Sequence, residues 1–237
     1  MVRVREMGRQ EFIGRYWNYR AGEHVTFLGP TGRGKTTLAY QLLDATATEE
    51  LPAVTLVMKP RDRTVSKWDR RMNSRVVRTW PPVKKPWENP PRSYTVWPKH
   101  SFTDIRADND RMAAAFFSAI TDSYRRGNRI LFADELYGLC NELSLQPEIV
   151  ALYTRGRSMG TGIWGASQRP SHIPLWAYSQ ASHVFMHRDP DRRARDRYAE
   201  IGGVDPDLVK RITASLPAFH YLYICQHGPY MCVIRAD

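Results

Sequence analysis

The stretch His24–Thr37, HVTFLGPTGRGKTT, decides the fold of this chain. Over residues 29–36 it matches the pattern G-x-x-x-x-G-K-[ST] without a gap. Glycines let the backbone curl so that successive N–H groups point at one bound phosphate. Residues 25–28 read as a short buried strand and residues 37–43 as a helix, which is the strand, loop and helix context that the pattern needs. The sequence therefore predicts a loop that binds a nucleoside triphosphate.

The polar positions of this loop have distinct expected roles. Lys35 should reach the β- and γ-phosphates, and the Thr36 hydroxyl should hold Mg²⁺. The positive end of the helix that begins near Gly34 adds to the stabilisation of the anion. The nucleotide-binding positions expected from the pattern are Gly29, Pro30, Thr31, Gly32, Arg33, Gly34, Lys35, Thr36 and Thr37.

A second signal follows about 100 residues later, in the segment 129–135, RILFADE. A short apolar strand that ends in adjacent carboxylates places them at the carboxyl edge of a parallel sheet, beside the phosphate loop. Asp134 would then bind Mg²⁺, and Glu135 could polarise a water for attack on the γ-phosphate. Gln168, after the small-residue strand 161–167, falls at the same edge, where its amide could sense the γ-phosphate or orient the water.

Composition bounds the class of protein. A chain of 237 residues with 42% hydrophobic and 25% charged residues fits one globular domain, residues 1–237. The apolar stretch 112–120 is too short to span a membrane, and no signal peptide is evident, so we expect a cytoplasmic protein, in a host cell or virion if it is viral. Three cysteines without metal-ligand spacing favour a reducing interior.

Positive charge is concentrated in one segment. The chain has a net charge of +11, and residues 59–99 hold twelve basic and three acidic residues together with seven prolines and four tryptophans. We interpret this basic insertion as an extended loop flanked by short strands at residues 75–79 and 93–97. Its basic and aromatic side chains suit nucleic-acid contact, although tryptophans packed on the core would account for them equally well.

The remaining chain supplies the other elements of an α/β fold. Residues 1–22 form an N-terminal arm or a short helix, and residues 218–235 form a C-terminal hairpin. Helices are expected at 104–126, 147–159, 191–201 and 205–214, with Asp205 as a cap, and a strand is expected at 183–187. The predicted fold class is α/β, with a mostly parallel central sheet flanked by helices.

Four of these segments together resemble the FtsK–HerA superfamily, the P-loop ATPases that translocate double-stranded DNA. The loop GPTGRGKTT is similar to that family's GPTGSGKS-type loop, and LFADE is similar to its strand ending in DE. The segment 156–170, GRSMGTGIWGASQRP, is similar to the one in which an arginine, a glycine and an apolar strand lead into TQRP or SQRP. Met58-Lys59-Pro60-Arg61-Asp62 also resembles the DxKxD ending of phage-encoded relatives, without its first acid.

The resemblance implies a RecA-like (ASCE) P-loop NTPase that uses ATP and Mg²⁺. It implies that Lys35 and Thr36 contact phosphate and metal, Asp134 holds Mg²⁺, Glu135 is the catalytic base and Gln168 is the sensor. Arg157 lies at the interval of the family's arginine finger, which completes the site of a neighbouring subunit, and Arg155 is close enough to be the alternative. The implied partners are dsDNA and further copies of the chain in a ring, hexameric or pentameric.

The compact length favours a viral genome-packaging motor that works with a capsid or portal protein. Two other functions stay open. A small-molecule P-loop kinase would use an arginine-rich lid such as residues 191–197, and an ATP-switched assembly protein would hydrolyse ATP slowly without responding to DNA.

Overall fold

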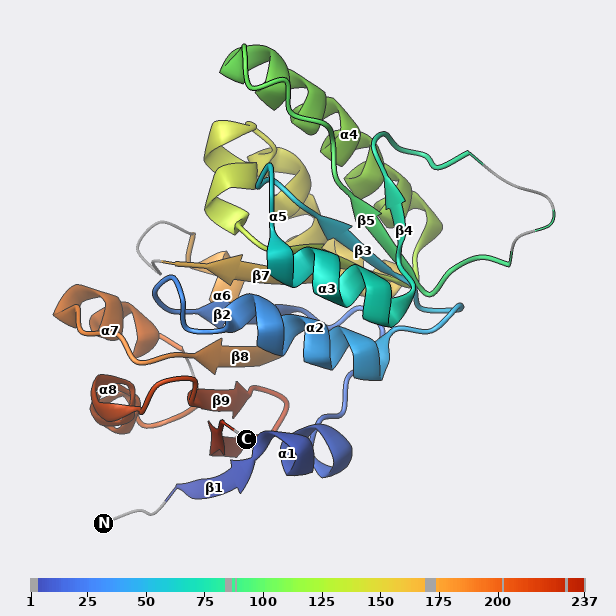
Figure 1. Ribbon diagram of the computed structural model, residues 1–237. Coiled ribbons are helices and arrows are strands. Elements are labelled where there is room, and N and C mark those ends of the chain that lie inside the picture. The colour runs from blue at the N-terminus through green and yellow to red at the C-terminus, as the bar shows by residue number, and fades with distance from the viewer. Residues whose placement is uncertain are drawn as a thin grey trace.

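A mostly parallel sheet runs through the molecule (Figure 1). The computed structural model describes residues 4–83, 87, 89–168, 174–201, 203–228 and 230–236. Within them the sheet has ten strands in the spatial order β1-β10-β9-β8-β2-β7-β6-β3-β5-β4, and β9 alone runs against the others. The strands are β1 (Arg5–Gly8), β2 (Val25–Leu28), β3 (Ala53–Leu56), β4 (Arg75–Val77), β5 (Ser93–Val96), β6 (Arg129–Ala133), β7 (Thr161–Ser167), β8 (His183–Met186), β9 (Tyr221–Cys225) and β10 (Tyr230–Arg235).

Helices cover both faces of this sheet, so the predicted α/β layering is confirmed. The α-helices are α1 (Arg9–Arg15), α2 (Lys35–Thr46), α3 (Arg63–Met72), α4 (Ile105–Arg126), α5 (Gln146–Arg155), α6 (Trp176–Ser179), α7 (Arg192–Tyr198) and α8 (Pro206–Ser215). Helices α1 to α3 pack on one face and α4 to α8 on the other. In β6, Ile130 and Phe132 face the first layer, whereas Leu131 and Ala133 face the second. Central strands buried on both faces need such continuous apolar runs.

The strand expected before the phosphate loop is present as β2, and the strand expected before the two acids is present as β6. The predicted C-terminal hairpin is formed by the antiparallel strands β9 and β10. Helix α4 begins at the Asp104 cap and buries the stripe Met112, Phe116 and Ile120, as the four-residue spacing predicts. The helix expected at 147–159 ends earlier, because α5 stops at Arg155 and a 3₁₀ helix follows over Gly156–Met159. Cys140, Cys225 and Cys232 are free thiols.

The prediction for residues 59–99 was wrong in one respect, because helix α3 forms inside the segment expected to be an extended loop. The Asp62 carboxylate caps it by accepting hydrogen bonds from the backbone N–H groups of Thr64 and Val65, at 2.8 and 3.1 Å. Val65, Trp68 and Met72 are buried at helical spacing against α2 and the sheet. The prolines that exclude a helix all lie outside residues 63–72, so they restrict the rest of the segment only.

The N-terminal arm is part of the sheet. Strand β1 pairs in parallel with β10, with Arg5 beside Cys232 and Met7 beside Ile234, and Phe12 of α1 is fully buried. This pairing is hard to predict from the sequence, because a strand of four residues is too short to show alternating hydrophobicity and its partner strand lies at the other end of the chain. None of the described helices is both long enough and apolar enough to cross a membrane.

Candidate functional site

The phosphate-loop segment joins β2 to α2 in the conformation that its glycines permit. Gly29, Gly32 and Gly34 have φ angles of 142°, 75° and 87°, values that side chains rarely adopt. Gly34 is the N-cap of α2, so the loop ends at the positive end of that helix. A cradle of backbone N–H groups at a helix N-terminus is a site for an anion such as phosphate.

The C-terminal part of the chain holds this loop from outside. The carbonyl oxygen of Arg33 accepts a hydrogen bond from the Tyr221 hydroxyl at 2.8 Å and lies 2.7 Å from Nε2 of His187. Burial lowers the pKa of His187 to about 4, so its ring is neutral near pH 7. The loop is therefore held by hydrogen bonds to β9 and to the residue that follows β8. Both strands lie on the opposite side of β2 from β7 and β6.

Lys35 lies in the loop with its ammonium group directed at backbone carbonyls. Its Nζ atom donates hydrogen bonds to the carbonyl oxygens of Gly29 at 2.5 Å and Pro30 at 2.9 Å. Burial lowers the pKa of Lys35 to about 8, although Glu135 and Asp134 raise it in part. A partly buried cation that donates to neutral carbonyls would gain an opposite charge when a phosphate binds.

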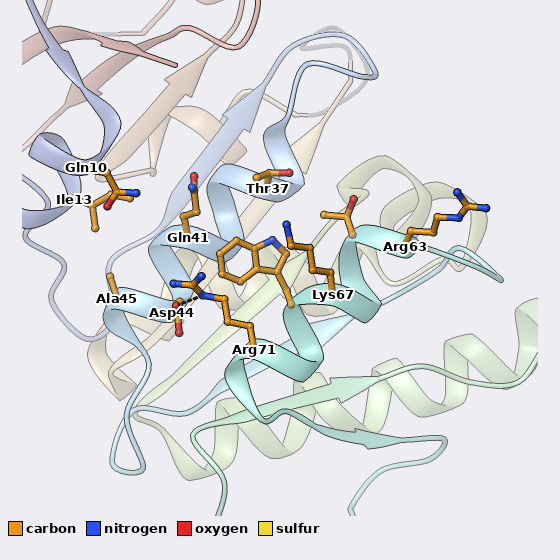
Figure 2. A pocket seen from close by; sticks show the side chains of 11 residues that line it. Gln10, Ile13, Thr37, Gln41, Asp44, Ala45, Arg63, Lys67 and Arg71 are labelled. Atoms are coloured by element: carbon orange, nitrogen blue, oxygen red, sulfur yellow. Dashed lines mark hydrogen bonds and ion pairs between the residues drawn. The ribbon is translucent and has the colours of Figure 1, made fainter. Parts of the chain in front are cut away.

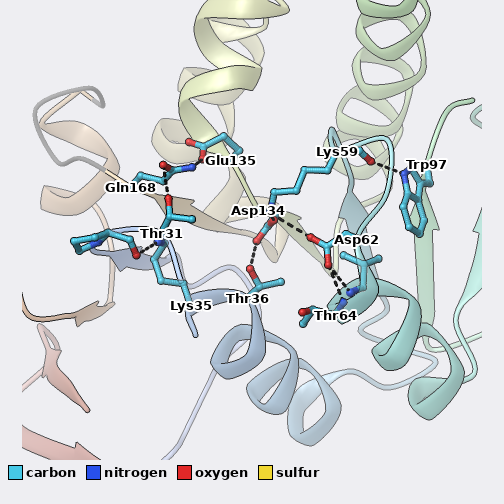
Figure 3. A network of polar contacts seen from close by, with 12 residues as sticks. Thr31, Lys35, Thr36, Lys59, Asp62, Thr64, Trp97, Asp134, Glu135 and Gln168 are labelled. Carbon is cyan, nitrogen blue, oxygen red and sulfur yellow. Dashed lines mark hydrogen bonds and ion pairs between the residues drawn. The ribbon is translucent and has the colours of Figure 1, made fainter. Parts of the chain in front are cut away.

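The two carboxylates that follow β6 reach the same cavity, but they have different partners (Figure 3). Asp134 is largely buried, accepts a hydrogen bond from the Thr36 hydroxyl at 2.6 Å and pairs with Nζ of Lys59 at 2.8 Å. Lys59 also lies 3.2 Å from Asp62. Burial lowers the pKa of Lys59, but Asp134 and Asp62 outweigh that effect and the net direction is upward. The Thr36 hydroxyl and the Asp134 carboxylate supply oxygen ligands of the kind that Mg²⁺ prefers.

Glu135 belongs to a second chain of hydrogen bonds. The amide nitrogen of Gln168 donates to Glu135 at 2.8 Å, and the Thr31 hydroxyl donates to the amide oxygen of Gln168 at 2.7 Å. Burial raises the pKa of Glu135, and the nearby Asp134 acts in the same direction against Gln168 and Lys35. A carboxyl group with a raised pKa at the edge of a cavity is suited to accept a proton from a water.

These groups line one cavity of 340 Å³. Its lining consists of Thr31, Gly32, Arg33, Gly34, Lys35, Thr36, Thr37, Lys59, Asp62, Thr64, Asp134, Glu135, Gln168 and Phe219. The sequence-predicted residues from three separate segments therefore meet in one place. The reason is that β2, β6 and β7 are parallel, so the residues that follow them share one edge of the sheet.

The comparisons with known proteins bear on the fold. No protein-family model and no curated protein sequence matches the chain. Among solved structures, the genome packaging NTPase B204 from Sulfolobus turreted icosahedral virus 2, in complex with sulfate, is similar with a TM-score of 0.67 at 13% identity, covering 92% of this chain and 98% of that one. Its complex with AMPPCP gives a TM-score of 0.65 at 14% identity over 92% and 100% of the two chains. VirB4 of Thermoanaerobacter pseudethanolicus gives 0.64 at 10% identity over 90% and 89%.

The chain shares the fold of these solved structures, among them the genome packaging NTPase. The strand order β8-β2-β7-β6-β3 puts the phosphate loop next to the strand that precedes Gln168 and one strand away from the two acids. The Arg169-Pro170 end of the similar segment lies outside the described residues.

Arg157 does not join the nucleotide cavity of its own chain. It lies in the 3₁₀ helix that precedes the amino end of β7, whereas Gln168 follows the carboxyl end of that strand. Seven strand residues span roughly 23 Å. The Arg157 side chain is exposed and makes no hydrogen bond or ion pair within the described part of the chain. Arg155 is also exposed, with its guanidinium 5.9 Å from the centre of the Tyr124 ring.

Sequence reasoning missed four residues that line the cavity: Lys59, Asp62, Thr64 and Phe219. Lys59 was noted as a charge of the basic insertion and within the segment 58–62 but was given no role in the site, yet it follows β3, which pairs in parallel with β6. That position at the carboxyl edge was a usable signal for Lys59. Phe219 had none, because it precedes β9, whose direction is opposite and whose place beside β8 is set by tertiary pairing.

Proposed function

We propose that this chain is an ATPase that translocates double-stranded DNA as a homo-oligomeric ring, of the kind that packages a viral genome. The observation that carries the proposal is the cavity in which the phosphate loop faces Asp134, Glu135 and Gln168 on a fold similar to that of a genome packaging NTPase.

The residues present fit ATP and Mg²⁺. Lys35 and the loop N–H groups would hold the phosphates, and the Thr36 hydroxyl with Asp134 would hold the metal, which neutralises charge on the β- and γ-phosphates. Glu135 would accept a proton from the attacking water, with Gln168 fixing its orientation through their 2.8 Å hydrogen bond. Thr36 bonds one oxygen of Asp134, Oδ1, and Lys59 contacts the other, Oδ2, so a metal held between Thr36 and Asp134 would compete with Lys59 for this carboxylate.

Arg157 is proposed to act on the site of a neighbouring subunit. Its place at the opposite edge of the sheet supports this role, and so does the lack of a side-chain partner for it among the described residues, because an arginine finger must extend away from its own domain. A finger supplied in trans makes turnover depend on ring geometry and couples hydrolysis to movement of neighbouring subunits. A capsid or portal protein remains the proposed docking partner of such a ring.

ATP turnover with and without dsDNA tests this function. Wild-type turnover should rise with dsDNA, and the stimulation should fall steeply with salt, because phosphate contacts release counterions. Phosphate transfer to a nucleoside without any response to DNA would instead identify a kinase. Slow hydrolysis, no effect of DNA and a stable ATP-bound complex would identify an assembly switch.

Mixing experiments test the ring. Arg157→Ala and Lys35→Ala subunits should each be inactive alone and should regain turnover when mixed, because a Lys35→Ala subunit still supplies its arginine to the intact site of an Arg157→Ala neighbour. Arg155→Ala is the matched control, since Arg155 is two residues away and also exposed but lies against Tyr124. No recovery of turnover in the mixture of Arg157→Ala and Lys35→Ala subunits would contradict action in trans.

A further inference from the structure

Phe219 lies at the end of the cavity away from the acids. Gln168 and the acids follow β7 and β6 on one side of β2, whereas Phe219 precedes β9 on the other side. A Cβ atom added to Gly34 would lie 3.3 Å from a ring carbon of Phe219, so the ring is close to the loop itself. If the terminal phosphate faces the acids, the nucleoside must leave the phosphate loop toward Phe219.

The backbone holds the Phe219 ring in an exposed position. Its φ angle is 61°, in the left-handed region that bulky residues seldom occupy, and its side chain is 48% exposed. The strained residue is fastened on both sides: Arg9 donates a hydrogen bond to the Phe219 carbonyl at 3.0 Å, and Tyr221 bonds Arg33. Backbone strain that the surroundings enforce at the rim of a cavity is a recognised mark of a ligand-contacting residue.

The polar groups at this end do not suit reading the edge of a base. Among the described residues that line the cavity, the single carboxamide is Gln168, which is occupied at the opposite end by Glu135 and Thr31. Gly34 lies against the Phe219 ring and Arg9 bonds the Phe219 carbonyl, so the contacts shown at this end include no carboxamide. An aromatic ring accepts any base through its π-face, whereas discrimination between bases requires hydrogen bonds to their edges.

We infer that Phe219 is the stacking platform for the nucleobase, so that the site selects the triphosphate by its phosphates and binds ATP and GTP almost equally. The inference rests on the proposed function, because it takes the phosphate loop to hold the triphosphate. It assigns a binding position to the nucleobase, which contacts neither the phosphate loop nor the acids in the proposed function.

A second hollow offers the alternative route for the nucleoside (Figure 2). It has a volume of 550 Å³, lies between α1, α2 and α3, and shares Thr37 and Thr64 with the nucleotide cavity. Trp68 is among the residues that line it but is only 7% exposed and is stacked on Tyr40, and Arg71 is paired with Asp44 at 2.9 Å. Its aromatic ring is thus already covered, whereas that of Phe219 is open.

Calorimetric binding of ATP, GTP, CTP and inorganic tripolyphosphate tests the inference. Phe219→Ala should weaken ATP and GTP binding by about tenfold, the usual effect of losing one base-stacking contact. Tripolyphosphate has no base, so its affinity should not change. Phe219→Trp should retain the ATP affinity, and wild type should bind ATP and GTP within about threefold and CTP more weakly, because a pyrimidine offers less surface for stacking.

Lys67→Ala, in the second hollow, is the matched control and should bind all ligands as wild type does. Weakened ATP binding by Lys67→Ala together with an unaffected Phe219→Ala would overturn the inference and place the base in the second hollow. A strong preference for ATP over GTP that survives in Phe219→Ala would also overturn it. Failure of wild type to bind tripolyphosphate would instead refute the proposed function, so the two failures are distinguishable.

Discussion

The two edges of the parallel sheet both carry buried charged groups, but they differ in what surrounds them. At the carboxyl edge, Asp134 pairs with Lys59 at 2.8 Å beside the cavity. At the amino edge, His183 pairs with Glu23 at 2.9 Å, and its other ring nitrogen lies 2.8 Å from the Tyr223 hydroxyl. The distances are nearly the same, so geometry alone does not separate a functional pair from a structural one.

Access to solvent separates them. The Lys59 side chain is 50% exposed, whereas those of Glu23 and His183 are 6% and 3% exposed. A charge at an open edge can exchange its protein partner for a metal or a phosphate at little cost. Glu23 also lies 3.2 Å from Nε2 of His227, so losing this buried carboxylate leaves His183 buried without its counter-charge and His227 without its carboxylate partner. The comparison predicts that changes at the first edge alter turnover and that changes at the second alter stability.

The strongest test is Glu135→Gln at the open edge. Turnover should fall by about 10² to 10⁴-fold, because the variant retains the shape of the side chain but loses the ability to accept a proton. The melting temperature should hold or rise, since the substitution removes a buried charge next to Asp134. Steady-state ATP hydrolysis and thermal unfolding measure the two effects. Unchanged turnover would show that Glu135 is not the base.

The matching change at the closed edge is Glu23→Gln. It should lower the free energy of unfolding by about 3 kcal/mol, because it leaves protonated His183 without its buried counter-charge. Turnover per folded molecule should not change. Glu200→Gln is the control, since Glu200 forms a pair of similar length, 3.0 Å, with Arg197 at the surface, and its loss should cost less than about 1 kcal/mol.

The stability that Glu23→Gln removes should depend on pH in a defined direction. Burial raises the pKa of Glu23, but His183 and the Arg20 N–H lower it further, and the net direction is downward. Burial lowers the pKa of His183, but its partners, Glu23 among them, raise it above 6.5. The Glu23 contribution is lost as pH falls through its lowered pKa, and the His183 contribution is lost as pH rises through its raised pKa. The stability difference between wild type and Glu23→Gln should therefore peak between pH 4.5 and 6.5.

Lys35 gives the open edge a pH dependence of its own. Burial lowers its pKa to about 8, so the empty site loses the charge above that pH, whereas a bound phosphate favours the protonated form. ATP affinity should thus fall as pH rises past about 8, approaching tenfold per pH unit. Lys35→Arg is the control, because arginine keeps its charge and its curve should stay flat over this range. A flat wild-type curve would contradict the role of the Lys35 charge.

The smallest expected effect is that of Lys59→Met. Its ammonium competes with Mg²⁺ for Asp134, so the variant should need about fivefold less Mg²⁺ for half-maximal turnover, the scale of one partly exposed ion pair. Arg71→Met removes a comparable pair, with Asp44 at 2.9 Å outside the nucleotide cavity, and should leave the Mg²⁺ requirement unchanged. A higher Mg²⁺ requirement for Lys59→Met would show that Lys59 assists the metal site instead of competing with it.

Much of the carboxyl edge was predictable because its chemistry is local in sequence. The spacing of Gly29, Gly34 and Lys35 encodes a turn, a helix start and a cation within eight residues, and an apolar run before Asp134 indicates the end of a buried strand. Helix α3 was predictable in principle from the Asp62 cap and the buried spacing of Val65 and Trp68, but the prolines and charges around it drew the interpretation toward a loop.

The sequence by itself determined the phosphate loop, the acidic strand end and the α/β class, because each depends on residues close together in the chain. Only the tertiary structure decided that β1 pairs with β10, that Lys59 contacts Asp134 and that Phe219 borders the nucleotide cavity. These contacts join residues 75 or more positions apart. The direction and order of the strands, and not local propensity, bring Lys59 and Phe219 to the cavity.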